Sequence, residues 1–212
     1  MGYFITFEGI EGSGKSTQAV RLAAYFESLG LNVVLTREPG GTGIGAQVRE
    51  ILLSAGNHDL DPLAELFLYE ADRAQHTAQL VEPSLKSGAW VICDRFMDAT
   101  AVYQGFARGL SAELVNGLNF TAAGGIRPRL TCLIDCPVEL GLARARKREA
   151  GGNQDRFERE DLEFHEAVRR GYLSLAEKEP ERFTVLDGTL GMDELEYDVR
   201  RRVEPLLTGS EA

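Results

Sequence analysis

Eight residues near the start of the chain have the types and spacing to hold a chain of phosphates. Residues 9–16 read GIEGSGKS, which fits G-x-x-x-x-G-K-S between a β-rich segment and a helical one. Glycines let backbone N–H groups turn toward phosphate oxygens, and the following helix adds its positive N-terminus. We expect Lys15 to reach the β- and γ-phosphates and Ser16 to ligate Mg²⁺. The motif predicts phosphate binding but does not specify a reaction.

A second pair of chemically suited residues follows an apolar run. The segment WVICDRF, residues 90–96, ends a buried strand pattern in Asp94 and Arg95. At the carboxyl edge of a parallel sheet, Asp94 can hold Mg²⁺ through its water shell, and Arg95 can point at a phosphate. The predicted metal site is therefore Ser16 with Asp94. The chain has no N-K-x-D motif, no Asp-Glu pair ending a strand and no H-R-D-x-x-x-x-N loop, which argues against a GTPase, a motor ATPase and a protein kinase.

Three further motifs carry a resemblance to a known family. They are TREPGGT at 36–42, EADRAQH at 70–76 and DRFMDATAVYQG at 94–105, and a final LDG stands at 186–188. In this order, together with the phosphate loop, they resemble the thymidylate (dTMP) kinase family along nearly the whole chain. The resemblance implies transfer of the γ-phosphate of ATP to dTMP, with Mg²⁺ as cofactor. It implies a P-loop nucleoside-monophosphate-kinase fold, which is an α/β fold with helices on both faces of a parallel sheet and a mobile lid.

The resemblance also implies roles for individual residues. Arg37 and Arg95 would clamp the acceptor phosphate, since two guanidiniums suit a dianion. Tyr69 stands where the family usually has a Phe that stacks on thymine, and Arg73, four residues later on a helix, would donate to a thymine carbonyl. The implied dTMP-binding residues are Glu8, Arg37, Pro39, Tyr69, Arg73, Arg95, Thr100, Tyr103 and Gln104. The implied ATP-binding residues of the loop are Gly9, Ile10, Glu11, Gly12, Ser13, Gly14, Lys15, Ser16 and Thr17.

A basic segment at about 142–158 is the expected lid. Some family members carry an arginine inside the phosphate loop, but this loop has none, so we expect the compensating charge to come from the lid. Among the arginines of LARARKREAGGNQDRFE we favour Arg148 as the catalytic one, then Arg156 and Arg144 as ATP-binding residues. The complete catalytic set is expected to be Lys15, Arg95, Arg148 and Glu8.

The expected chemistry needs no general base. A nucleoside monophosphate is mostly dianionic near pH 7, because its second pKa is about 6, so its oxygen is already a nucleophile. Three alternatives stay open. The first is the same chemistry on another acceptor such as dUMP, the second a P-loop module that binds ATP without transferring phosphate, and the third a deoxynucleoside kinase with Glu8 as the base.

The elements that must position these residues alternate between strand and helix. We expect strands at 3–8, 32–38, 90–96, 129–136 and 182–188. Helices are expected at 15–30, 45–56, 63–88 (interrupted at Pro83), 138–149, 160–179 and 192–207. The alternation predicts a parallel sheet covered on both faces, in a single domain spanning 1–212.

Composition narrows the partners. The net charge of −10 argues against a nucleic-acid binder, and no apolar run approaches the ~20 residues that span a bilayer. The N-terminus has no signal-peptide pattern, and Cys93, Cys132 and Cys136 read as buried strand thiols, so we expect a cytoplasmic protein. The resemblance implies a homodimer, which we expect to form through helix faces such as that of Leu63, Leu66 and Phe67.

Overall fold

A five-stranded parallel sheet is the centre of the fold in the computed structural model, which describes residues 2–148, 156–157 and 160–209. The strand order is β2-β3-β1-β4-β5, and every neighbouring pair is parallel. This confirms the predicted fold class. The strands are β1 (Phe4–Glu8), β2 (Val33–Arg37), β3 (Trp90–Asp94), β4 (Leu130–Asp135) and β5 (Phe183–Asp187).

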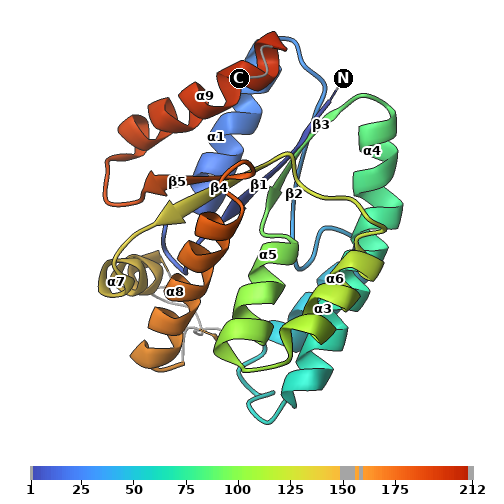
Figure 1. Cartoon of the computed structure of the whole chain (residues 1–212), viewed down its shortest axis with the longest axis vertical. Coiled ribbons are helices and arrows are strands. Elements are labelled where there is room, and N and C mark those ends of the chain that lie inside the picture. The colour runs from blue at the N-terminus through green and yellow to red at the C-terminus, as the bar shows by residue number, and fades with distance from the viewer. Residues whose placement is uncertain (1, 149–155, 158–159, 210–212) are drawn as a thin grey trace.

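Helices cover both faces of the sheet (Figure 1). On one face, α1 (Lys15–Ser28) and α9 (Met192–Thr208) pack on alternate strand residues such as Ile5, Ile92 and Ile134. The opposite face is covered by α4 (Glu82–Lys86), α5 (Met97–Thr100) and α8 (Leu162–Lys178). The remaining helices are α2 (Gly43–Leu53), α3 (Pro62–His76), α6 (Ala112–Ala122) and α7 (Val138–Arg148). Strands that are apolar on both faces are what a sheet buried between two helical layers requires.

Strand register brings three of the sequence motifs together. Arg37 of β2 lies opposite Asp94 of β3, and Asp94 lies opposite Phe7 of β1. Because these strands are parallel, their carboxyl ends meet at one edge of the sheet. The phosphate loop, TREPGGT and the Asp94-Arg95 pair all begin at this edge.

Two helical stretches differ from the expectation. The interruption predicted at Pro83 was wrong, because α3 continues through a π-helical segment, η1 (Thr77–Val81), directly into α4. The wider turn leaves Pro83 in the first turn of α4, where its missing N–H is not needed. A second π-helical segment, η2 (Ala101–Ala107), follows α5, and neither η2 nor α6 was predicted.

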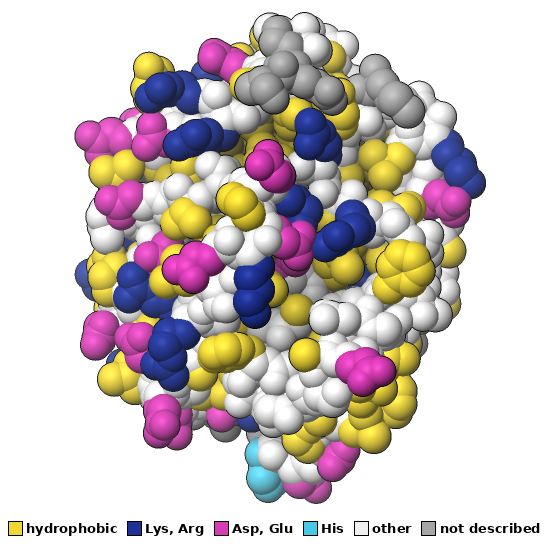
Figure 2. Space-filling model, in the orientation of Figure 1, with side chains coloured by type: hydrophobic (Ala, Val, Ile, Leu, Met, Phe, Trp, Pro, Cys, Tyr) yellow, Lys and Arg dark blue, Asp and Glu magenta, His cyan; other side chains and the backbone are white. Residues whose placement is uncertain are grey.

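The surface carries both signs of charge. On the face drawn in Figure 2, Lys and Arg side chains alternate with Asp and Glu. Within the described part of the chain, no helix combines the length and the apolar character needed to cross a bilayer.

Leu63 and Phe67 of α3 are exposed as expected, but Leu66 is fully buried, so its assignment to an outer helix face was wrong.

Candidate active site

The phosphate loop lies between β1 and α1 in the expected place. Gly9, Gly12 and Gly14 all have positive φ, and Lys15 Nζ donates to the carbonyl of Ile10 at 3.0 Å. A Cβ on Gly12 would lie 1.9 Å from the carbonyl oxygen of Gly141 in α7. The loop is therefore shaped both by left-handed backbone and by close packing against α7.

Ser16 and Asp94 form a pair suited to a hydrated divalent cation. Ser16 Oγ donates to Asp94 Oδ2, and Asp94 Oδ1 is buried without a hydrogen-bond partner in the described residues. The described residues contain no cluster of three or more acidic, His or Cys side chains that could hold a metal. Mg²⁺ usually takes only one or two protein ligands and completes its shell with phosphates and water. The orphaned oxygen beside a hydroxyl fits that donor set.

Lys15 is buried among charged neighbours. Burial, and secondly the positive charge of Arg95, lower the pKa of Lys15 to about 8. Asp94 and Glu11 oppose this shift. Lys15 is therefore mostly protonated below pH 8, where its ammonium can pair with phosphate oxygens.

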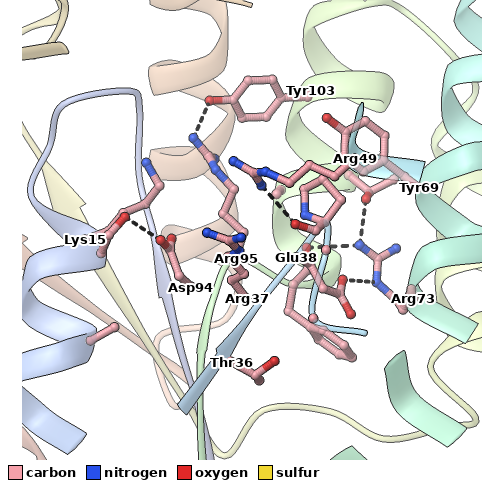
Figure 3. Close-up of a pocket in the computed structure, with 18 of the residues that line it drawn as sticks. Lys15, Thr36, Arg37, Glu38, Arg49, Tyr69, Arg73, Asp94, Arg95 and Tyr103 are labelled. Carbon is pink, nitrogen blue, oxygen red and sulfur yellow. Dashed lines mark hydrogen bonds and ion pairs between the residues drawn. The ribbon is translucent and has the colours of Figure 1, made fainter. Parts of the chain in front are cut away.

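One large cavity joins the phosphate loop to the other motifs (Figure 3). Its volume is about 770 Å³, within the range of small-ligand sites. The cavity brings together thirteen of the predicted site residues, namely Glu11, Gly12, Lys15, Ser16, Arg37, Pro39, Tyr69, Arg73, Asp94, Arg95, Thr100, Tyr103 and Gln104. The predicted residues that do not line it are Glu8, Gly9, Ile10, Ser13, Gly14, Thr17, Arg144 and Arg156.

Arg95 lines the cavity, and part of its hydrogen-bonding capacity is not used by the described residues. Its Nη1 donates to Tyr172 Oη at 3.0 Å, and its Nη2 donates to Glu11 Oε1 at 2.9 Å and to Tyr103 Oη at 3.0 Å. A guanidinium has five N–H donors. Two donors of Arg95, on Nε and Nη1, therefore have no acceptor among the described residues and can take up an anion.

Glu11 links the phosphate loop to this cluster. Burial would raise the pKa of its carboxyl, but the charge of Arg95 and the nearby His165 hold that pKa far below its ordinary value. Glu11 Oε1 accepts from Arg95 and also from Tyr103 Oη at 2.7 Å. Glu11 was predicted only as an ATP-loop residue, yet its side chain contacts residues predicted for the acceptor.

Arg73, in contrast, has a protein acceptor for every N–H group. It is 1% exposed and lies in a pocket of carboxylates and carbonyls. Its predicted bond to a thymine carbonyl stays a prediction, and a donor would first have to leave one of its present partners. The acceptors are Glu38 Oε2 (3.0 Å), Glu70 Oε2 (2.9 Å), Asn119 Oδ1 (2.6 Å), the Phe96 carbonyl (3.2 Å) and Thr100 Oγ1 (2.9 Å).

The TREPGGT loop presents one exposed cation and one buried turn. The side chain of Arg37 is exposed, and it makes no hydrogen bond or ion pair with the described residues. Pro39 is buried, and its carbonyl accepts from Arg49 Nη1 at 2.9 Å. Arg49 lies on α2 and lines the cavity, a role that a lone arginine in an amphipathic helix does not signal in the sequence.

Glu8 lies beneath the cavity rather than in its wall. It is fully buried, its Oε1 accepts from the Phe96 N–H at 2.8 Å, and its Oε2 accepts from Tyr172 Oη at 2.7 Å. Burial, followed by the charge of Asp98, raises the pKa of the Glu8 carboxyl to about 7. Direct contact of Glu8 with an acceptor stays a prediction, since its observed partners are both protein groups.

The lid arginines fall on and around the undescribed residues. Arg144 Nη1 donates to the carbonyl of Gly188 at 2.6 Å. Arg156 pairs with the buried Glu65 and donates from Nε to the carbonyl of Leu52 at 3.1 Å. The side chain of Arg148, the last residue of α7, and residues 149–155 and 158–159 lie outside what the structure describes. A catalytic role for a lid arginine therefore stays a prediction.

Several residues of the site were not anticipated. Tyr172 and His165 lie on α8, and His165 Nδ1 is 3.4 Å from Glu11 Oε2. Phe157 lines the cavity and meets Tyr103 edge to face at 5.6 Å. The sequence signals these residues poorly, because an aromatic or His side chain at helical spacing reads as ordinary core.

Three features surround one cavity at the edge of the parallel sheet: the phosphate loop, the Asp94-Arg95 strand end and the loop that carries Arg37. This combination defines a P-loop nucleotide phosphotransferase. Comparison with known proteins then gives the family. The thymidylate kinase family model matches residues 7–199. The chain is 54% identical to the thymidylate kinase of Pelobacter propionicus over 198 residues, which cover 92% of this chain and 90% of that protein. It is 56% identical to that of Geobacter sulfurreducens over 196 residues, which cover 91% and 92%.

A solved structure agrees with the sequence relatives. The crystal structure of thymidylate kinase from Ehrlichia chaffeensis superposes with a TM-score of 0.78 and 36% identity, covering 96% of this chain and 98% of that one. The chain belongs to the thymidylate kinase family.

Proposed function

We propose that the two ends of the cavity hold the two substrates of a single phosphoryl transfer. As a member of this family, the enzyme transfers the γ-phosphate of ATP to dTMP, giving dTDP and ADP for dTTP synthesis. The observation that carries the assignment of the ends is the joining of Lys15 and Ser16 to Arg37 and Arg95 in one space. A module that only binds ATP has no need of that second cationic end.

At the donor end we assign the ATP phosphates to the loop. The inward N–H groups of residues 9–14 and the N-terminus of α1 would cradle them, and Lys15 would turn from the Ile10 carbonyl to the β- and γ-phosphates. Ser16 and Asp94 would hold Mg²⁺, which when bound neutralises charge on the transferring group. The orphaned Asp94 oxygen supports this role.

At the acceptor end we assign the dTMP phosphate to the free donors of Arg95 and to Arg37. A dianionic phosphate is already nucleophilic, so these arginines need only orient it in line with the γ-phosphate. Tyr69, Thr100, Tyr103 and Gln104 also line the cavity, together with Arg73 and Pro39, and we assign the base and sugar of dTMP to these residues. Gln104 already donates to Glu65 at 2.7 Å, which fixes the orientation of its amide.

For the lid we propose that an arginine neutralises the transferring phosphoryl group. Arg148 is the first candidate, and Arg156 and Arg144 follow. Replacing Arg148 with Ala is expected to reduce kcat much more than dTMP affinity, because the charge acts mainly in the transition state. Equal losses in both would remove Arg148 from this role.

The test of the reaction is ADP release from Mg·ATP, coupled to a spectrophotometric readout. The acceptors are dTMP, dUMP, ribothymidine monophosphate, dCMP, dGMP, AMP and thymidine, with a blank that contains no acceptor. Strong turnover with dTMP over a low blank is the expected result. Turnover with thymidine would point to a deoxynucleoside kinase, and turnover that does not depend on the acceptor would withdraw the roles of Arg37 and Arg95. The comparison of dTMP with dUMP measures discrimination based on a single methyl group, which an apolar pocket can favour by about 1–3 kcal/mol.

We further propose a cytoplasmic homodimer formed by single-domain subunits. The three cysteines are buried and unpaired, as suits a reducing compartment. Ile51 of α2, Leu63 and Phe67 of α3 and Phe120 of α6 are exposed on neighbouring helices, and such apolar surface is typical of an interface. Sedimentation of Phe67→Glu beside a Tyr197→Glu control tests this, since only the first should give monomers.

A further inference from the structure

The backbone of Arg95 is held in an unfavourable conformation. Its φ of 71° is left-handed, and among the described residues Arg95 is the only non-glycine with positive φ. Such a conformation is sterically unfavourable for a residue that carries a side chain. It persists because neighbours fix the turn on both sides. Arg95 N–H donates to the Phe7 carbonyl at 3.0 Å, and Phe96 N–H donates to Glu8 Oε1 at 2.8 Å.

The Tyr172 hydroxyl connects this turn to the Arg95 side chain. Tyr172 lies on α8, is 1% exposed and is far from Arg95 in the sequence. Its O–H donates to Glu8 Oε2 at 2.7 Å, and the same oxygen accepts from Arg95 Nη1 at 3.0 Å. One oxygen of Glu8 therefore accepts from the backbone N–H just after Arg95. The other oxygen accepts from Tyr172, which in turn accepts from the Arg95 guanidinium.

Neither Tyr172 nor Glu8 lines the cavity. The groups that reach the cavity from this cluster are Arg95, Tyr103 and Glu11. The two donors of Arg95 that have no acceptor among the described residues lie on Nε and on Nη1, the nitrogen that also donates to Tyr172. The direction of these donors is thus set by Tyr172, which does not line the cavity, together with Glu11 and Tyr103, which hold Nη2.

We infer that Tyr172 is a positioning residue for phosphoryl transfer, which acts through Arg95 and together with Glu8 aims the guanidinium at the acceptor phosphate. The inference rests on the proposed role of Arg95 in acceptor binding. It also gives Glu8 a specific part, which is to hold the strained turn and orient the tyrosine hydroxyl.

The competing explanation is that Tyr172 only fills the core. Its ring packs in an apolar cluster with Val168, Phe183 and Tyr103, the last edge to face at 6.3 Å. Tyr172→Phe keeps that ring and removes only the hydroxyl. A core-filling residue would tolerate this change with little effect on ligand binding, whereas a positioning residue would not.

The experiment measures binding of dTMP, thymidine and Mg·ATP to the full chain by calorimetry, for wild type and Tyr172→Phe. Loss of the hydroxyl leaves a buried carboxylate oxygen and a guanidinium N–H without their partner, so dTMP affinity should fall about 10-fold. Thymidine, which has no phosphate, and Mg·ATP should bind as before. KM for dTMP should rise in parallel while KM for ATP stays unchanged. Tyr197→Phe, at a 63% exposed tyrosine, is the matched control and should behave as wild type.

A double-mutant cycle with Arg95→Lys tests whether Tyr172 acts through Arg95. If it does, Tyr172→Phe should have no further effect on dTMP affinity in the Arg95→Lys protein. Additive losses, unchanged dTMP affinity, or equal losses for dTMP and thymidine would each overturn the inference. Should Tyr172→Phe fail to fold, Glu8→Gln is judged by the same comparison of dTMP with thymidine. Wild-type protein that does not phosphorylate dTMP would instead overturn the proposed function, so the two failures are distinguishable.

Discussion

The buried ion pair between Glu38 and Arg73 allows a quantitative prediction of stability. Glu38 is 4% exposed, its Oε2 accepts from Arg73 Nε at 3.0 Å, and its Oε1 lies 2.7 Å from His76 Nδ1. In Glu38→Gln the amide oxygen can still accept from Arg73, and the amide nitrogen can donate to His76. The shape of the network then survives, and only the negative charge is lost.

The magnitude follows from what remains around Arg73. Removing one partner of a buried ion pair costs about 3–5 kcal/mol when the other charge is left uncompensated. Glu70 still pairs with Arg73 at 2.9 Å, and the hydrogen bonds can be remade, so part of this cost is avoided. We expect Glu38→Gln to lower the free energy of unfolding by about 2–3 kcal/mol. For a domain of this size that corresponds to a fall in Tm of about 5–10 °C.

Urea unfolding at pH 7, followed by circular dichroism, measures the difference. The matched control is Glu82→Gln, since Glu82 pairs with Lys86 at an exposed i,i+4 position. That pair is expected to contribute no more than about 0.5 kcal/mol. A Glu38→Gln protein as stable as the control variant would refute the view that Arg73 depends on a balanced charge.

Other features give predictions of pH dependence and backbone strain. Burial, and secondly the charge of Glu38, raise the pKa of Asp72 from 3.8 to about 6. The folded protein therefore binds this proton more tightly than the unfolded chain, and it loses stability as the pH rises from 3.8 to about 6. Asp72→Asn should therefore gain unfolding free energy relative to wild type as pH increases from 3.8 to about 6, and a constant difference would contradict this. Because the pKa of Lys15 is lowered to about 8, kcat/KM for ATP should fall as pH rises through 8, and a profile flat across that pH would exclude the cause. Gly30→Ala, at positive φ in open space, should cost about 1 kcal/mol in urea unfolding, whereas Gly12→Ala must also displace Gly141 and should lose more stability together with ATP binding.

Short-range sequence signals were enough for the fold and for one half of the site. The phosphate loop is contiguous, and its glycines, lysine and serine have fixed geometric tasks. Asp94 and Arg37 end strands that a parallel sheet must bring to one edge, so their approach followed from the alternation of strands and helices. The thymidylate kinase motifs added the residues that we expect to bind the acceptor, and most of them line the cavity.

What the sequence did not reveal depends on long-range packing. Arg49, Tyr172 and His165 come from α2 and α8, and their approach to the cavity depends on how those helices sit on the sheet. The π-helical segments η1 and η2 escaped for a related reason. η2 packs against α8 and α6, whereas apolar periodicity in the sequence reports only the average helical repeat.

Counting donors separates the arginines of the cavity into two kinds. The five N–H groups of Arg73 all have protein acceptors, so Arg73 is part of the framework that ties α3 to the TREPGGT loop. Within the described part of the chain, two N–H donors of Arg95 have no acceptor, and the side chain of Arg37 makes no hydrogen bond or ion pair. An anion is attracted to all three charges, but it can form hydrogen bonds at once only with Arg95 and Arg37.

The same count explains how an acidic loop can face an anionic substrate. The carboxylate of Glu11 is paired with Arg95 and Tyr103, so its charge is already balanced when a phosphate approaches. Arg95 is in turn held from the other side by Tyr172 and, through it, by Glu8. A guanidinium fixed between Glu11 and Tyr172 loses little further freedom on binding, and it would present the proposed acceptor phosphate with a positive charge whose position is already set.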